Sequence, residues 1–113
     1  MDMFSALAEP TRRAIVELLA RNGQLSASEI YDKFPVSHPA ISQHLKILRT
    51  ANLVLVEKHA QQRMYKINPD GIAELEAWAK RMTRRWDEHF APLGALLEIE
   101  KGKYQREDKH ALR

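Results

Sequence analysis

The sequence predicts a mainly α-helical domain with one small β-hairpin. Three segments carry apolar residues at helical spacing, and they cover residues 10–22, 26–33 and 37–51. Two runs rich in β-branched and aromatic residues follow, at 53–58 and 63–67. A longer helix then repeats apolar residues at alternating spacings of three and four. These three observations set the fold class.

Chain length and composition limit the classes of protein that fit. A chain of 113 residues predicts one small domain, placed at residues 1–100, with a charged and flexible tail at 101–113. The lack of cysteine excludes disulfides and thiolate metal sites. The first residues contain an acid and no basic or long apolar run, and no apolar run approaches a membrane span. We expect a cytoplasmic protein that does not bind membranes.

Two helices are predicted before residue 24. The first is short and carries three apolar residues on one face: Met3, Phe4 and Leu7. The second begins at Pro10, because a missing N–H costs little in a first turn, and ends at Gly23, which accepts a left-handed backbone. We expect Arg12 and Arg13 to face outward.

The next two helices form a helix-turn-helix by pattern. Ser26 and Glu29 have the spacing of a capping box, and the helix they begin is expected to run to about Lys33. Pro35-Val36 separates the two helices, and Ser37 is a good N-cap for the second one. The second helix is longer and more basic than the first, as in a DNA-binding helix-turn-helix.

The helix predicted at residues 37–51 has two different faces. Ile41, Leu45 and Leu48 share an apolar face. Small residues on the other face would allow close approach to DNA, Ser and Gln can meet base edges, and Lys can contact phosphate. Alone, the pattern also fits an ordinary amphipathic surface helix. The residues of the outer face are Pro39, Ala40, Ser42, Gln43, Lys46 and Thr50.

The predicted hairpin at residues 53–67 follows the helix-turn-helix directly, so it is expected to be a wing. Its link, residues 59–62, is polar, and the tip carries Gln61, Gln62 and Arg63. The tip suits a neighbouring groove or phosphate, although a solvated loop would have the same composition. The link contains no glycine, so the turn type is not predicted.

The last predicted helix begins with Asn68 as N-cap and Pro69 in its first turn. Its apolar repeat has more surface than one small core can cover, which favours a homodimer, while packing against the chain's own first helix is the alternative. Pro92 and Gly94 are expected to kink or break the helix. The predicted dimer interface consists of Met3, Phe4, Leu7, Ile72, Leu75, Ala79, Met82, Trp86 and Phe90.

Positive charge is concentrated in the helix-turn-helix and wing. The net charge of the whole chain is only +3. Residues 37–66 contain five basic residues and one acidic residue, a net charge of +4, which leaves −1 for the rest. Such an uneven distribution is expected of a surface that faces phosphate.

Three motifs together resemble the ArsR-type winged-helix repressors, over about residues 3–90. The segment Ala8-Glu9-Pro10-Thr11-Arg12-Arg13 resembles their opening signature, and Ser42-Gln43-His44-Leu45-Lys46 resembles their recognition helix. Asn52-Leu53-Val54 followed by Arg63-Met64-Tyr65 resembles their wing. The resemblance implies a winged helix-turn-helix that dimerises through its first and last helices. It also implies a palindromic operator in double-stranded DNA, usually with repression.

The metal sites of that family do not fit this sequence well. One needs cysteine, and the chain has none. The other lies on the C-terminal helix, where Asp87 and His89 match its first half but Glu100 and Lys103 fall in its second half, and lysine is a poor ligand. We expect no metal, no cofactor and a member of the metal-independent branch, with a metal-responsive repressor as an alternative. The sequence identifies no small-molecule or protein effector.

The outer helix face and the wing supply the candidate DNA-binding residues. Ser42 and Gln43 are candidates for base readout, since Gln can pair bidentately with adenine. Residues 37–40 lie where helix amides can hold a phosphate, and the basic residues, Lys58 among them, suit phosphate contacts. His44 borders the apolar stripe and has either a structural or a DNA-binding role. The candidate set is Ser37, His38, Pro39, Ala40, Ser42, Gln43, His44, Lys46, Arg49, Gln62 and Arg63.

An enzyme is not expected. The five histidines lie on separate elements, and no glycine-rich phosphate loop or nucleophile–base arrangement is present. Two other interpretations fit the sequence. One is a winged helix that only contacts proteins, and the other is a DNA-binding protein that activates transcription or shapes DNA instead of repressing.

Overall fold

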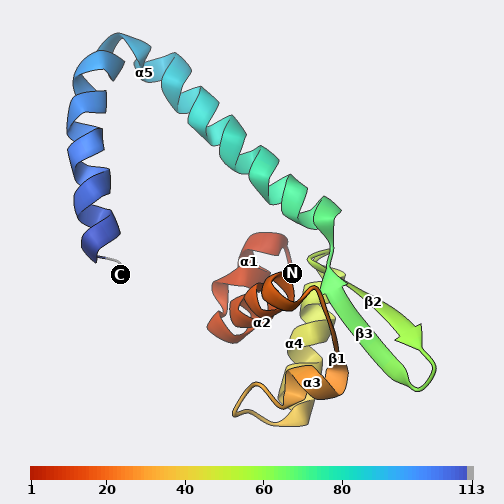
Figure 1. Ribbon diagram of the computed structural model, residues 1–113. Helices are drawn as coiled ribbons and strands as arrows, with labels where there is room; N and C mark the ends of the chain where they lie inside the picture. The colour runs from red at the N-terminus through yellow and green to blue at the C-terminus, as the bar shows by residue number, and fades with distance from the viewer. Residues whose placement is uncertain (112–113) are drawn as a thin grey trace. The chain divides into compact units, whose positions relative to one another are not determined.

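The structure is a computed structural model, which describes the backbone of residues 1–111 and the side chains of residues 1–90. It divides into two compact units, residues 1–76 and the remainder of the last helix, and each unit is described by itself. The elements in chain order are α1 (Met3–Ala8), α2 (Pro10–Asn22), β1 (Gln24–Ser26), α3 (Ala27–Tyr31), α4 (His38–Thr50), β2 (Val54–His59), β3 (Gln62–Ile67) and α5 (Pro69–Ala111) (Figure 1).

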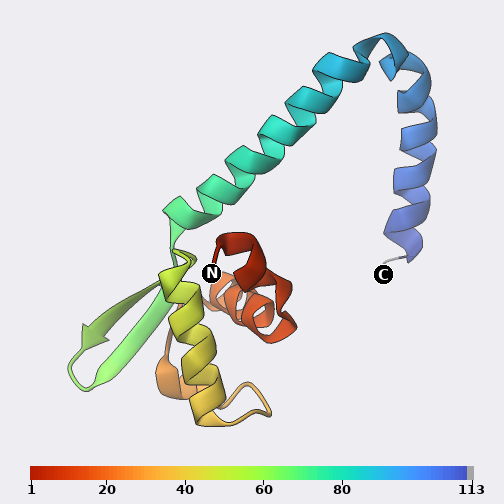
Figure 2. The same cartoon turned by 180° about the vertical axis from the view of Figure 1, so that it is seen from behind.

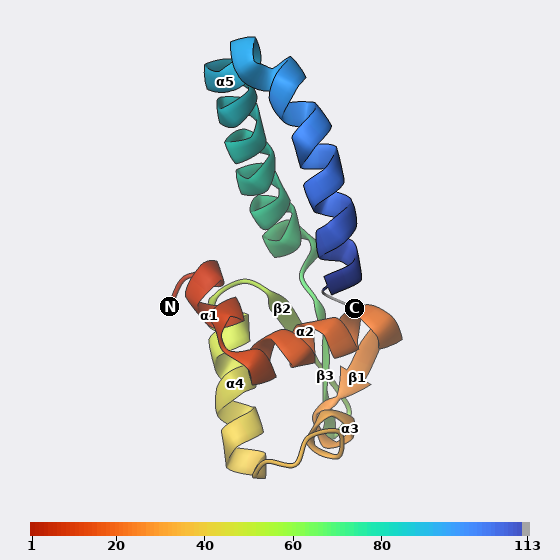
Figure 3. The same ribbon diagram turned by 90° about the vertical axis from the view of Figure 1, so that its left-hand side faces the viewer.

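The predicted fold class is confirmed. The chain is mainly helical, with a small three-stranded antiparallel sheet in which β2 and β3 form the wing. Figure 2 shows α4 beside the β2–β3 hairpin, and Figure 3 shows the loop of residues 32–37 that joins α3 to α4. The helix-turn-helix and the wing therefore lie next to each other in the first unit.

The local signals at the helix-turn-helix are confirmed at atomic level. Ser26 Oγ accepts from the Glu29 amide at 3.2 Å, and Glu29 Oε1 accepts from the Ser26 amide at 2.9 Å, which completes the capping box. Ser37 Oγ accepts from the Ala40 amide at 3.2 Å. Tyr31 stacks on His38 across the turn, with ring centroids 4.5 Å apart. The helix that Ser26 caps ends at Tyr31, two residues before the predicted end.

The predicted outward position of Arg12 is wrong. Its side chain is buried, with 8% exposed. Arg12 continues the buried stripe of Ile15 and Val16 one turn toward the start of α2, and α1 covers that position. Its Nε donates to the Ala6 carbonyl at 2.7 Å, which satisfies an oxygen at the C-terminus of α1 that has no helical partner. The arginine thus holds the first two helices together.

The stripe of α4 lies at the centre of the core. Ile41 and Leu48 are fully buried, and Leu45 is almost so. Truncating a leucine in such a place costs about 2–5 kcal/mol of stability. The other members of the buried cluster come from every element of the first unit: Ala6, Ile15, Val16, Leu18, Leu19, Leu25, Ile30, Ala51, Leu53, Val54 and Tyr65.

The sheet contains a strand that the sequence does not predict. β1 pairs antiparallel with β3, so the strand order is β1-β3-β2. Leu25 lies opposite Tyr65 in the register, and both side chains are buried. β1 escaped prediction because a three-residue strand has no measurable alternation, and its partner is about 40 residues away.

The start of α5 is fixed against the turn that follows α4. Asn68 Nδ2 donates to the Asn52 carbonyl at 3.0 Å, and the Asn68 amide donates to the Leu53 carbonyl at 3.0 Å. A Cβ on Gly71 would lie 1.8 Å from the Asn52 oxygen, so only glycine fits there. The first turn of α5 therefore packs backbone against backbone.

The far part of α5 is one continuous helix by its backbone. The kink or break predicted at Pro92 and Gly94 does not end the helix, although the ribbon changes direction sharply in that region (Figure 1). The backbone is helical to Ala111. A flexible tail at residues 101–113 stays a prediction, and the side chains of Leu93, Leu96 and the residues beyond lie outside the described ones.

The two-residue turn of the wing stores backbone strain. Ala60 has φ of 56°, in the left-handed region that an L side chain adopts at a cost of about 1–2 kcal/mol. We predict that Ala60→Gly stabilises the protein by about 0.5–1 kcal/mol, since relief of that strain exceeds the added freedom of the unfolded chain, about 0.4–1 kcal/mol. The urea midpoint of unfolding measures the change.

Gln61→Gly is the matched control, because Ala60 and Asn52 are the only non-glycine residues with positive φ in the described backbone. The control variant should be less stable than the wild type by about 0.5–1 kcal/mol. A lower urea midpoint for Ala60→Gly would contradict the strained turn.

Candidate nucleic-acid interface

The outer face of α4 is solvent-exposed as predicted. Ser42, Gln43 and Lys46 are exposed, while Ile41 and Leu45 on the other side are buried in the core. Because a helix alternates its faces with a period of 3.6 residues, burying one stripe fixes the direction of the other. The polar side chains are thus presented from a rigid backing.

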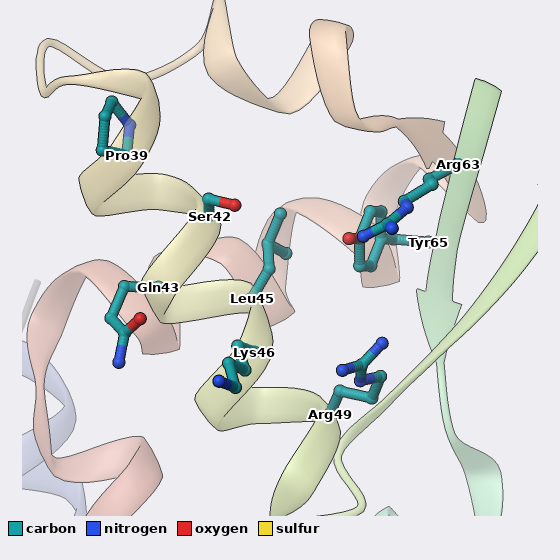
Figure 4. Close-up of a pocket in the computed structure, with 8 residues that line it drawn as sticks. All are labelled: Pro39, Ser42, Gln43, Leu45, Lys46, Arg49, Arg63 and Tyr65. Carbon is teal, nitrogen blue, oxygen red and sulfur yellow. The ribbon is translucent and has the colours of Figure 1, made fainter. Parts of the chain in front are cut away.

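A cationic concavity lies between α4 and the wing. It has a volume of about 320 Å³, and Figure 4 shows Arg49 on α4 and Arg63 on β3 on facing sides of it. Leu45 and Tyr65, both buried, also line it. The lining residues include three cations and no carboxylate, which favours an anionic partner. They are Pro39, Ser42, Gln43, Leu45, Lys46, Arg49, Arg63 and Tyr65.

The wing holds two cations whose mutual repulsion lowers the stability of the hairpin. Lys58 lies directly opposite Arg63 in the β2–β3 register, so their side chains are on the same face. Like charges in that arrangement destabilise a hairpin. An external phosphate would relieve the repulsion, so this pair supports a role for Arg63 in DNA binding.

Other charges of the wing neutralise one another. Glu57 Oε1 lies 3.4 Å from Lys66 Nζ, and Glu57 Oε2 lies 3.1 Å from His59 Nε2. The hydrogen bond from His59 and the charge of Lys66 lower the pKa of Glu57. Lys66 therefore contributes less to the positive surface than its place in the basic segment indicated.

The N-terminus of α4 offers fewer amides than its sequence implies. The Ala40 amide donates to Ser37 Oγ, and Pro39 has no N–H. The amides of Ser37 and His38 are the candidate donors to a phosphate. The stack of His38 on Tyr31 holds His38 in place, so this candidate residue also packs in the first turn of α4.

His44 is directed toward α2. Its Nδ1 lies 3.3 Å from Arg12 Nη1 and 3.7 Å from Glu9 Oε2. Glu9 caps α2 by accepting from the Arg12 amide at 2.8 Å, and this bond is the main cause of the lowered pKa of Glu9. The sequence left two roles open for His44, structural or DNA-binding. Its contacts with Arg12 and Glu9 match the structural role.

Sequence reasoning missed two residues of this region. Tyr65 lines the concavity and Arg12 holds His44. Both could have been noticed, since Tyr65 occupies an apolar phase of its strand and Arg12 occupies the buried phase of its helix. Their partners, however, lie far away in the sequence.

The predicted dimer residues separate into two groups. Met3, Leu7, Ile72 and Leu75 are partly buried against the chain's own core, as the alternative reading held. Phe4, Trp86 and Phe90 are about half exposed, at 50%, 51% and 41%. Trp86 and Phe90 contact each other, with ring centroids 4.4 Å apart. Ala79 is exposed, and Met82 is intermediate.

The candidate metal ligands on α5 do not assemble within residues 1–90. No group of three or more His, Asp or Glu residues that could hold a metal ion occurs among the side chains the structure describes. His89 Nδ1 lies 3.1 Å from the Arg85 carbonyl oxygen. Glu100 and Lys103 fall outside the described side chains. None of the helices in the described part of the chain is long and apolar enough to cross a membrane.

Comparisons with known proteins agree with this geometry. Residues 7–57 match the family model described as a helix-turn-helix domain. The HTH-type transcriptional regulator Rv2034 of Mycobacterium tuberculosis is 45% identical over 85 residues, which is 71% of this chain and 78% of that protein. The transcriptional repressor SdpR of Bacillus subtilis is 31% identical over 76% of this chain and 94% of its own length.

A crystal structure of an ArsR family transcriptional regulator, RHA00566, superposes with a TM-score of 0.68 at 30% identity, and the match covers 74% of this chain and 86% of that one. The fold, the helix-turn-helix and the relatives agree with one another. This chain belongs to the ArsR family of winged helix-turn-helix transcriptional regulators.

Proposed function

We propose that the protein is a homodimeric repressor in the cytoplasm that binds a palindromic operator in double-stranded DNA and catalyses no reaction. The observation that carries the proposal is the exposed polar face of α4 beside the cationic concavity. An α-helix fits the major groove of B-DNA, and a neighbouring hairpin reaches the next phosphates or groove. The names of the relatives, regulator and repressor, support the same output.

In this proposal α4 is the recognition helix. Ser42 and Gln43 meet base edges, because they are exposed on the face opposite the core. Lys46, Arg49 and Arg63 neutralise phosphates on either side of the concavity. Ser37, His38, Pro39, Ala40 and Gln62 lie at the edges of this surface, while His44 acts from behind it.

The homodimer is supported by apolar surface that the chain does not cover itself. Trp86 and Phe90 form an exposed aromatic pair, and Phe4 is half exposed on α1. Exposed aromatic surface of this kind is typical of subunit interfaces. A two-fold dimer would present two copies of α4 to half-sites about one helical turn apart, which is why a palindrome is proposed.

Gln43→Ala tests base readout. We expect it to lose about 1–3 kcal/mol of binding free energy at one base position of the operator, while binding to random duplex changes little. Titration of the selected operator, its single-base variants and random DNA measures the effect. Gln24→Ala, an exposed glutamine on β1, is the control and should bind like the wild type. Equal losses on operator and random DNA would reject the assigned role.

Phosphate contacts are tested by the salt dependence of binding. Lys46→Ala and Arg63→Ala should each weaken binding to all duplexes, and each should reduce the slope of log K against log salt by about one unit, because one fewer counterion is released. The exposed Arg21→Ala, in the last turn of α2, should leave the slope unchanged. An unchanged slope in both test variants would show that neither Lys46 nor Arg63 contacts a phosphate.

Trp86→Glu tests the homodimer. A charge in the aromatic pair should convert the dimer into monomers and lower operator affinity at least tenfold, because two half-sites are no longer bound together. Sedimentation velocity measures the state of association. Glu88→Gln, on the same helix, should remain dimeric. A monomeric wild type that binds its operator would overturn the dimer. If the wild-type protein binds no duplex at low salt, a winged helix that only contacts proteins is the remaining interpretation.

A further inference from the structure

Arg12 connects three segments of the first unit through one buried guanidinium. Its Nε donates to the Ala6 carbonyl at 2.7 Å, and Nη2 approaches the Ser5 carbonyl at 3.4 Å and Met1 Sδ at 3.6 Å. Its Nη1 lies 3.3 Å from His44 Nδ1 on α4. The side chain thus binds the C-terminal carbonyls of α1 with one edge and α4 with the other.

The chemistry of arginine fixes the state of the histidine. A guanidinium has only donors, so His44 Nδ1 must accept, and the ring is neutral with its proton on Nε2. The alternative contact of Nδ1, with Glu9 Oε2 at 3.7 Å, would need a proton on Nδ1, which excludes the bond from Arg12. The observed network therefore depends on a single tautomer of His44.

This bond adds a directional constraint to the apolar packing of α4. The hydrophobic effect holds α4 against the core but does not depend on direction, so it limits rotation of the helix about its axis only through side-chain fit. His44 directly follows Ser42 and Gln43, and a hydrogen bond at 3.3 Å ties that turn of the helix to a fixed point on α2. A small rotation of α4 would displace both side chains from the base edges.

We infer that Arg12 is a positioning residue, which sets the rotation of α4 through His44 and makes operator recognition depend on the placement of α1. This inference rests on the proposed roles of Ser42 and Gln43. The acceptors of Arg12 on α1 are backbone carbonyls of Ser5 and Ala6, so a displacement of α1 removes the anchor of His44.

Two pairs of variants of the full chain separate positioning from folding. Arg12→Met removes the donors and keeps much of the apolar stem. His44→Phe removes the acceptor, whereas His44→Asn returns an oxygen two bonds from Cβ, where Nδ1 lies. We expect Arg12→Met and His44→Phe each to lower operator affinity about tenfold, with random-duplex affinity within twofold of wild type. The double variant should be no worse than either single one, and His44→Asn should recover binding to within threefold.

The tautomer gives a readout that does not depend on DNA. Nitrogen-15 spectra of the wild type should show His44 with a bare Nδ1 and a protonated Nε2, and the Nδ1 resonance should shift in Arg12→Lys. A protonated Nδ1 in the folded wild type would overturn the inference. So would operator binding by Arg12→Met at wild-type strength, or losses that multiply in the double variant.

Failure of this inference is distinguishable from failure of the proposed function. If the wild type binds no duplex, the proposed function fails, whereas normal wild-type binding with indifferent variants rejects only the role of Arg12. If Arg12→Met does not fold, the comparison of His44→Phe with His44→Asn decides, because it leaves the bonds between Arg12 and α1 in place. Equal affinity of those two variants would then reject the role.

Discussion

The burial of one stripe of α4 is the constraint on which the rest of the structure depends. Ile41, Leu45 and Leu48 are the centre of a core to which every other element of the first unit contributes. Because these side chains cannot leave the core without a cost of several kcal/mol, the opposite face has no freedom to turn inward. In this small domain, one helix is both the main core element and the surface that we propose faces DNA.

The sequence predicted what is encoded locally and missed what depends on distant partners. The capping residues Ser26 and Ser37 and the apolar period of α4 act within a few residues, so their patterns were sufficient. β1 exists only because β3 pairs with it, and Arg12 is buried only because α1 folds over α2. The apolar repeat of α5 gave no sign that Ile72 and Leu75 pack on the core while Trp86 remains exposed, because one period serves both uses.

The surface also shows where function opposes stability. Lys58 and Arg63 face each other across the wing, and Ala60 adopts a left-handed backbone, each at some cost to the fold. Elsewhere in the hairpin, Glu57 pairs with Lys66 and contacts the ring of His59. The unfavourable features lie together near the tip of the wing, where we propose contact with DNA. Local violations of folding rules are expected at functional sites.

The short strand β1 has a mechanical consequence for the wing. It pairs only with residues 64–66 of β3, so the base of the hairpin belongs to a three-stranded sheet, whereas the outer residues, 58 to 63, are held by one partner strand alone. Two-stranded ribbons twist more readily than wider sheets. The hairpin is therefore stiff at its root and compliant at its end. The tip of the hairpin can therefore adjust to duplexes of different groove width while α4 keeps its position.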